Sequence, residues 1–118
     1  MIQGIGLDIV SIQRIEDVMS RQSGFIDRVL TDREKAEYMQ LQGRRKSEYV
    51  AGRFAAKEAF SKAIGTGIGR DCGFLDVEIL RSERGAPVLY TTKTPHAVHV
   101  SISHSESSAV AQVILEER

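Results

Sequence analysis

The sequence predicts an α+β fold, in which a long buried helix and shorter helices pack on a small antiparallel sheet. Up to about residue 64, apolar residues recur with the spacing of helices, whereas from about residue 74 they alternate with polar residues, as in strands. Helices that precede strands along the chain are typical of the α+β class. With 118 residues, of which 42% are hydrophobic, we expect one domain over residues 1–118 with its own core.

The composition gives no sign of several classes of partner. Lys plus Arg and Asp plus Glu number 16 each, so we expect neither nucleic acid nor an anionic membrane as a charge-guided partner. The first ten residues are apolar but contain Asp8 and lack a basic leader, so we interpret them as neither signal peptide nor membrane span. Cys72 is the single cysteine; we interpret it as structural and expect a reduced, cytoplasmic compartment.

A first strand is expected at residues 1–10, which are rich in Ile and Val. Gly4 and Gly6 would permit another backbone to approach closely. Asp8 interrupts the apolar pattern and has two interpretations. It either has a partner inside the fold, because burial of an isolated carboxylate is costly, or it caps the helix that follows.

Shorter helices are expected at residues 11–20, at residues 24–30 and from about residue 32 to Gly43. Arg14 and Arg21 lie on the outer side of the first of these helices. Thr31 and Glu34 have the spacing of a capping box and open the third. The basic run at residues 44–46, taken alone, is most simply a solvated turn before the long helix.

The long helix is expected from about Glu48, with Ser47 as its N-cap, to Ile64, followed by Gly65. It is apolar on nearly every side, which is typical of a buried helix, so some of its charged residues must be buried or lie in a cleft. Glu58 and Lys62 lie one turn apart on one face. They form either an ordinary helix ion pair or a carboxylate for a metal beside an ammonium for a phosphate.

Glycines and strands follow the long helix. The glycine-rich turn at residues 65–69 either ends the helix or lets backbone N–H groups approach a phosphate. Strands are expected at residues 74–80, 88–91, 98–103 and 108–115, the first two joined as a hairpin through Gly85. His104 lies at the end of the third of these strands, and a lone histidine is more often a hydrogen-bonding structural residue than a catalyst.

Four blocks of sequence, in order and at their spacing, resemble a known family: Gly4–Val10, Phe54–Gly67, Gly85–Pro87 and Val100–Ser105. They resemble the holo-acyl-carrier-protein synthases, the small bacterial phosphopantetheinyl transferases. The resemblance covers nearly the whole chain and implies transfer of 4'-phosphopantetheine from coenzyme A to a serine of apo-acyl carrier protein. The products would be holo-acyl carrier protein, used in fatty acid biosynthesis, and adenosine 3',5'-bisphosphate. It also implies a homotrimer with active sites between subunits.

The resemblance assigns roles to particular residues. Asp8 and Glu58 would hold Mg²⁺, with Mn²⁺ as an alternative, and Lys62 would contact the pyrophosphate; these three would be catalytic. The expected coenzyme A contacts are Arg45, Arg53, Ser61, Lys62, Gly65, Gly85, Pro87 and His104. Of these, Arg45, Arg53 and His104 would face the ribose phosphate across a subunit boundary. Arg14, Arg21 and Phe25 would bind the carrier protein. The proton acceptor stays open between Glu58, Asp8 and a metal-bound water.

Two other functions compete with this one. A non-catalytic module that binds coenzyme A or a nucleotide would lack the metal carboxylates, whereas Asp8 and Glu58 are both present. A transferase that serves larger synthases would, by family resemblance, have about twice this length.

The last strand is apolar on both faces, with Ala109, Ala111 and Val113 on one and Val110 and Ile114 on the other. We therefore expect the second face of the sheet to pack against other subunits.

Overall fold

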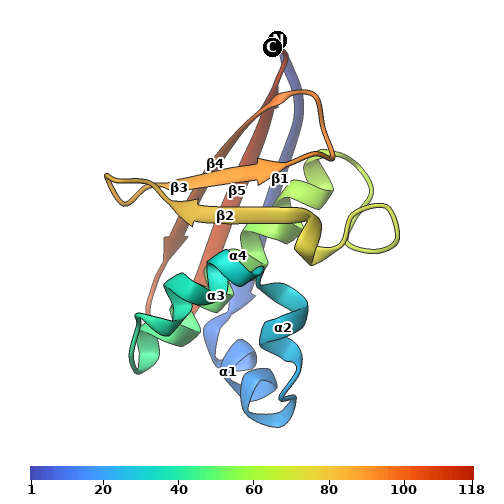
Figure 1. The fold of residues 1–118 in the computed structure, drawn as a ribbon. Coiled ribbons are helices and arrows are strands. Elements are labelled where there is room, and N and C mark those ends of the chain that lie inside the picture. The colour runs from blue at the N-terminus through green and yellow to red at the C-terminus, as the bar shows by residue number, and fades with distance from the viewer.

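The structure is a computed structural model that describes residues 1–118. Its elements, in chain order, are β1 (Ile2–Ser11), α1 (Ile12–Arg21), α2 (Phe25–Val29), α3 (Asp32–Met39), α4 (Arg44–Ala63), a 3₁₀ turn (Phe74–Asp76), β2 (Val77–Arg81), β3 (Pro87–Thr91), β4 (Ala97–His104) and β5 (Ser108–Glu116) (Figure 1). After the first strand, the helices precede the remaining strands, and both sheets are antiparallel, which confirms the α+β prediction.

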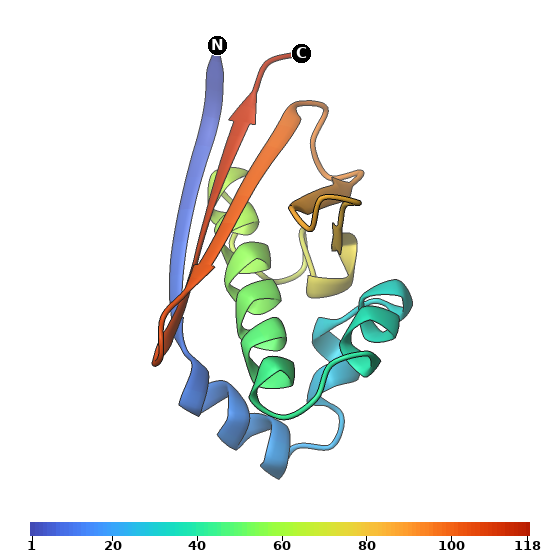
Figure 2. The same ribbon diagram turned by 90° about the vertical axis from the view of Figure 1, so that its left-hand side faces the viewer.

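Helix α4 lies in the middle of the molecule, between two layers. On one side is a three-stranded antiparallel sheet with the order β1-β5-β4, and on the other are the β2-β3 hairpin and the short helices α2 and α3 (Figure 2). Two clusters of buried side chains both include residues of α4, so this helix contributes to the whole core. No helix has the length and apolar character needed to cross a bilayer.

The first strand packs directly on the backbone of α4. A Cβ atom at Gly6 would lie 1.8 Å from the carbonyl oxygen of Ala59, and one at Gly4 would lie 2.4 Å from that of Ala63. Only glycine permits such a separation, because real Cβ atoms do not approach within 3.0 Å of other atoms. The predicted close approach is therefore present, and the next residue on this face of β1 is Asp8.

Helix α4 is buried on nearly all sides, as its sequence predicts, and it buries charged residues as well as apolar ones. Lys57 is fully buried and Arg53 is 8% exposed. The predicted start at Glu48 is wrong, because α4 begins at Arg44, after Gly43 with a φ of 61°. Ser47 is therefore buried within the helix and is not its N-cap, and the basic run at residues 44–46 forms the first turn of α4.

Other predicted boundaries also differ. Helix α3 ends at Met39, four residues before Gly43, and the predicted strand at residues 74–80 begins only at Val77. The three residues before Val77 form the 3₁₀ turn instead, in which the Asp76 carboxylate accepts a hydrogen bond of 2.8 Å from the Gly73 N–H. The capping box is present as predicted, with bonds between Thr31 and Glu34 in both directions.

Candidate active site

Asp8 and Lys62 meet where β1 crosses the end of α4. The Lys62 ammonium donates to Asp8 Oδ1 at 2.9 Å and to the Leu7 carbonyl oxygen at 3.1 Å, and its side chain is half exposed. Glu58 lies one turn earlier on α4 but forms no ion pair with Lys62. The interpretation of Glu58 and Lys62 as an ordinary helix pair therefore does not describe this structure, since the lysine bonds to the strand.

Glu58 lies in a partly buried, negatively charged environment. Burial raises the pKa of its carboxyl above the ordinary value, the Asp8 carboxylate raises that pKa further, and Lys62 opposes both effects. Two carboxylates that influence each other electrostatically, beside a cation, suit Mg²⁺, which commonly takes one or two carboxylates and completes its octahedron with water and substrate oxygens. No group of three or more His, Cys, Asp or Glu side chains converges anywhere in the chain, so these two carboxylates would hold the ion without a third.

A second, basic site lies at the other end of α4. It is a cavity of about 260 Å³ lined by Leu41, Arg45, Glu48, Tyr49, Gly52, Arg53, Arg81, Gly85, Pro87, Ile102 and His104. Five residues predicted to contact coenzyme A thus come together in one chain. His104 and Ile102 lie on the face of β4 that packs toward α4, which is how a residue at the strand end reaches this cavity.

The guanidinium of Arg53 is held from several sides within the basic cavity. Its Nε donates to the Ile79 carbonyl oxygen at 3.3 Å, its Nη2 lies 3.4 Å from Glu37 Oε1, and its Cζ lies 4.0 Å from the centroid of the Tyr49 ring. The Tyr49 hydroxyl donates to the same carboxylate at 2.7 Å, and burial raises the pKa of this phenol, so it remains a donor. These contacts fix the guanidinium before any ligand binds.

Sequence reasoning missed Glu48 and Arg81 in the basic cavity. Glu48 Oε1 lies 3.6 Å from His104 Nε2, and its Oε2 lies 3.4 Å from Arg44 Nε. Arg81 pairs with Pro87 in the hairpin, so its place beside a predicted ligand residue follows from the strand register. The hairpin was predicted, but its register was not, and that is why Arg81 was overlooked.

The carboxylate site and the basic cavity do not meet within one chain. Asp8 belongs to β1 and His104 to β4, and these are the two outer strands of the sheet, with β5 between them. One chain therefore presents each half of the predicted site at a different edge.

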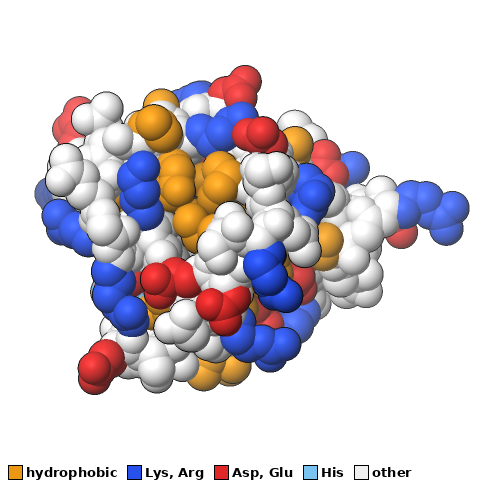
Figure 3. Space-filling model, turned by 90° about the horizontal axis from the view of Figure 1, so that it is seen from below, with side chains coloured by type: hydrophobic (Ala, Val, Ile, Leu, Met, Phe, Trp, Pro, Cys, Tyr) orange, Lys and Arg blue, Asp and Glu red, His pale blue; other side chains and the backbone are white.

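A hollow of about 300 Å³ lies between α1, α2, β1 and α4, lined by Ile9, Val10, Ser11, Arg14, Ile15, Val18, Phe25 and Phe54. Seen from below, the molecule shows hydrophobic side chains gathered in a hollow among charged ones (Figure 3). The ring of Phe25 stacks on Phe54 with centroids 6.1 Å apart. Arg14 lies on the rim of this hollow, Arg21 is exposed at the end of α1 outside it, and Phe25 lines the hollow although only 9% of it is exposed.

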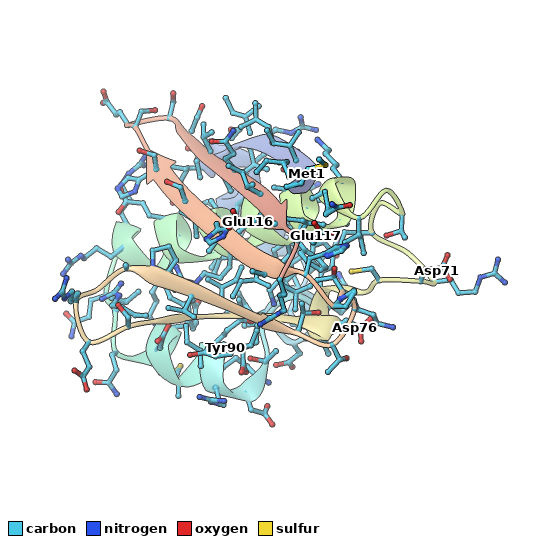
Figure 4. The ribbon with its side chains drawn as sticks, turned by 90° about the horizontal axis from the view of Figure 1, so that it is seen from above. Met1, Asp71, Asp76, Tyr90, Glu116 and Glu117 are labelled. Carbon is cyan, nitrogen blue, oxygen red and sulfur yellow. The ribbon has the colours of Figure 1, made fainter.

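The glycine turn after α4 has the geometry of a helix C-cap. The N–H groups of Thr66 and Gly67 both donate to the Ser61 carbonyl oxygen at 3.1 Å. The Gly65 N–H donates to the Lys62 carbonyl oxygen at the same distance. The Ser61 hydroxyl is buried and donates to Glu58 O at 2.7 Å. These donors are thus already used within the chain. The loop beyond them, which carries Asp71, extends away from the molecule (Figure 4).

The family model described as the 4'-phosphopantetheinyl transferase superfamily matches residues 4–114. The holo-[acyl-carrier-protein] synthases of Bacillus cereus (strain B4264) and Anoxybacillus flavithermus (strain DSM 21510 / WK1) are each 55% identical over 116 residues, which are 98% of this chain and 97% of the relative.

Two solved structures are also similar. One is a holo-(acyl-carrier-protein) synthase from Bacillus anthracis strain Ames in complex with CoA (3',5'-ADP). It has a TM-score of 0.94 and 52% identity and covers 100% of this chain and 99% of that one. The other, from Helicobacter pylori with coenzyme A, has a TM-score of 0.84 and 38% identity and covers 95% of this chain and 99% of that one. With the carboxylates and the basic cavity already located, these matches confirm the resemblance seen in the sequence: the chain belongs to the 4'-phosphopantetheinyl transferase superfamily.

Proposed function

We propose that this chain is a holo-acyl-carrier-protein synthase, which transfers 4'-phosphopantetheine from coenzyme A to a serine of apo-acyl carrier protein for fatty acid biosynthesis. The observation that carries the proposal is the convergence of Asp8, Glu58 and Lys62 at the contact of β1 with α4. Residues 1–118 would act as one transferase domain. The buried free thiol of Cys72 suits a reducing compartment, so we place the reaction in the cytoplasm.

In the reaction, the serine oxygen of the carrier protein attacks the phosphorus that carries the pantetheine. The bond from that phosphorus to the bridging oxygen breaks, adenosine 3',5'-bisphosphate leaves, and the serine proton passes to a base, for which this chain offers Glu58 and Asp8. Such a transfer needs in-line positioning and neutralisation of charge more than covalent help. Lys62, which now neutralises Asp8, is half exposed and can reach a pyrophosphate oxygen as a point charge. Asp8 and Glu58 would hold Mg²⁺, which supplies positive charge to the phosphate oxygens when bound.

The basic cavity is our proposed site for the nucleotide end of coenzyme A. Arg45, Arg53 and His104 would meet the ribose phosphate, and Gly85 with Pro87 would lie along the adenine. Since this cavity and the carboxylates lie at opposite edges of one sheet, a complete site needs the β4 edge of one subunit beside the β1 edge of another. Repetition of such a head-to-tail contact gives a ring when the rotation between neighbours closes, and the family resemblance implies a ring of three subunits.

The outer face of the sheet supports this assembly. Ile5, Leu7 and Ile9 of β1 are 61%, 59% and 65% exposed, and through the β1-β5 register they lie beside Ile114, Gln112 and Val110. The predicted outward face of β5 is thus present, and β1 enlarges it. An exposed apolar strip of this kind on a sheet is typical of an interface. Val113, in contrast, is fully buried against α4, so an interface test belongs at Ile114.

The hollow beside α1 is our proposed docking surface for the carrier protein. An apolar depression around Phe25, with Arg14 on its rim and Arg21 at the end of α1, would bind a helix with an apolar stripe and acidic flanks. This places the carrier protein next to β1 and hence near Asp8.

The test is incubation with coenzyme A, Mg²⁺ and apo-acyl carrier protein, read by intact mass. We expect the carrier protein to gain one phosphopantetheinyl group, and a carrier protein without its acceptor serine to gain none. Binding of coenzyme A without any mass gain would favour the non-catalytic module. Faster modification of a carrier domain from a larger synthase would favour the other transferase class.

A further inference from the structure

Helix α4 contains a buried cation that the proposed reaction does not use. Lys57 is fully buried, and its ammonium donates to the Val29 carbonyl oxygen and to Glu34 Oε1, both at 2.6 Å. Glu34 is also fully buried. Its Oε1 accepts from the Thr31 N–H at 2.8 Å and its Oε2 accepts from the Ile79 N–H at 2.7 Å. These bonds leave no buried side-chain polar atom without a partner.

The pair joins four elements that carry the two proposed substrate sites. Val29 ends α2, the helix that begins with Phe25 of the docking hollow. Ile79 lies in β2, two residues before Arg81 in the basic cavity, and its carbonyl oxygen also accepts from Arg53. Lys57 directly precedes Glu58 on α4. The four elements are thus tied together at a single point on the side of α4 away from the sheet, one residue before Glu58 in the helix.

Stability alone is a weak reason for such a pair. Two charges lose their hydration on burial, and well-packed apolar residues of similar size are often as stabilising or more so. Bonds from two charged groups to fixed backbone atoms do, however, define geometry, because a shift of a few tenths of an ångström weakens several charge-assisted bonds together. Apolar packing has no such directional requirement.

We propose that Lys57 and Glu34 are positioning residues that fix the β2-β3 hairpin and helix α2 relative to Glu58. Within one subunit they thereby hold the carrier protein on the docking hollow at a set distance from the carboxylates. They also hold the basic cavity in place on α4, so that a coenzyme A bound there is presented in a fixed position to the carboxylates of the neighbouring subunit. This inference rests on the proposed function for the identity of the substrates, but not for the placement of the elements.

The test compares Lys57→Met and Glu34→Gln with the parent, well below their melting temperatures. Each variant should raise KM for coenzyme A and KM for carrier protein, each by about tenfold, because each substrate would lose roughly one well-placed polar contact and such a loss weakens binding by about that factor. The control is Phe60→Leu, which removes packing from the same helix at a fully buried residue outside the pair. The control should lower the melting temperature and leave both KM values unchanged.

A second readout does not depend on activity. Amide exchange should become faster at Ile79 and at the end of α2 in the variants, and stay unchanged in β5. If the variants lower only the melting temperature, as the control does, or raise KM for one substrate alone, the proposal is overturned. If Lys57→Met does not fold, Glu34→Gln, which keeps an oxygen acceptor, decides by the same criteria. A parent that shows no transfer at all would contradict the proposed function, while the exchange measurement would still decide whether the pair positions the elements.

Discussion

Replacement of Gly6 by Ala should move Asp8 on β1 away from Glu58 and Lys62 on α4 without removing any of these three side chains. The new Cβ atom would lie 1.8 Å from the Ala59 carbonyl oxygen, whereas ordinary contacts begin at 3.4 Å. The obstacle is helix backbone, which cannot rotate away. Strand β1 must therefore move outward by about 1.6 Å, the difference between these distances. Asp8, two residues along, moves with it, so its carboxylate is drawn away from Glu58 and from the position at which Lys62 now bonds to it at 2.9 Å.

The expected loss in kcat for Gly6→Ala is about a hundredfold, because a misplacement near 1 Å costs roughly that much. Overpacking should lower the free energy of unfolding by about 1–3 kcal/mol, so the variant should remain folded in a protein of ordinary stability. Transfer is followed by intact mass of the carrier protein, and folding by circular dichroism at the assay temperature. Gly69→Ala is the matched control, since a Cβ atom there meets nothing within 4 Å. A folded Gly6→Ala protein with kcat within about twofold of the control would refute the reasoning.

Four further outcomes are expected. Asp8→Ala should remove most transfer activity and leave the fold intact, and a chelator should do the same to the parent until Mg²⁺ or Mn²⁺ is restored; near-normal turnover of the variant would contradict the metal assignment. Burial raises the pKa of Glu58 above the 4.5 of an ordinary glutamate, so its carboxylate takes up a proton at a higher pH as the solution is made more acidic. Affinity of the free enzyme for Mg²⁺, measured by titration at several pH values, should therefore begin to fall at a higher pH than with an ordinary glutamate. Arg14→Glu or Arg21→Glu should raise KM for carrier protein far more than KM for coenzyme A, and this difference should shrink with added salt; equal effects would exclude α1 as the docking surface. Ile114→Asp should give monomers in sedimentation with much reduced transfer, and a monomer with full turnover would contradict a site shared between subunits.

Local patterns in the sequence predicted most of the elements correctly. The capping box at Thr31 depends on residues three apart, and the hairpin through Gly85 depends on alternation over a few positions, so both are visible in a short window. The start of α4 was wrong because Ser47 is a good N-cap by residue type, while Gly43 with its positive φ provides the actual entry.

Long-range partners were not predictable in the same way. The basic residues of the cavity were assigned only through the resemblance to a family, since nothing local distinguishes Arg53 from other helix arginines. The pairing of Lys57 with Glu34 joins residues 23 apart, and that of Glu34 with Ile79 joins residues 45 apart. The sequence did show that α4 must bury charge, but the identity of the partners depends on how α3 and β2 pack on it.

Strand β1 links assembly to the carboxylate site through its register. Its even-numbered residues Gly4, Gly6 and Asp8 face α4, and its odd-numbered residues Ile5, Leu7 and Ile9 face outward. A slip of one residue would exchange the two faces. It would press large side chains against the α4 backbone, where not even a methyl group fits at Gly6, and would turn Asp8 away from Lys62. The glycines therefore fix the register, and the same register presents the apolar strip proposed to join subunits. A protein that folds at all with this strand in place must present the carboxylate and the strip together, which is the arrangement that a site shared between neighbouring subunits requires.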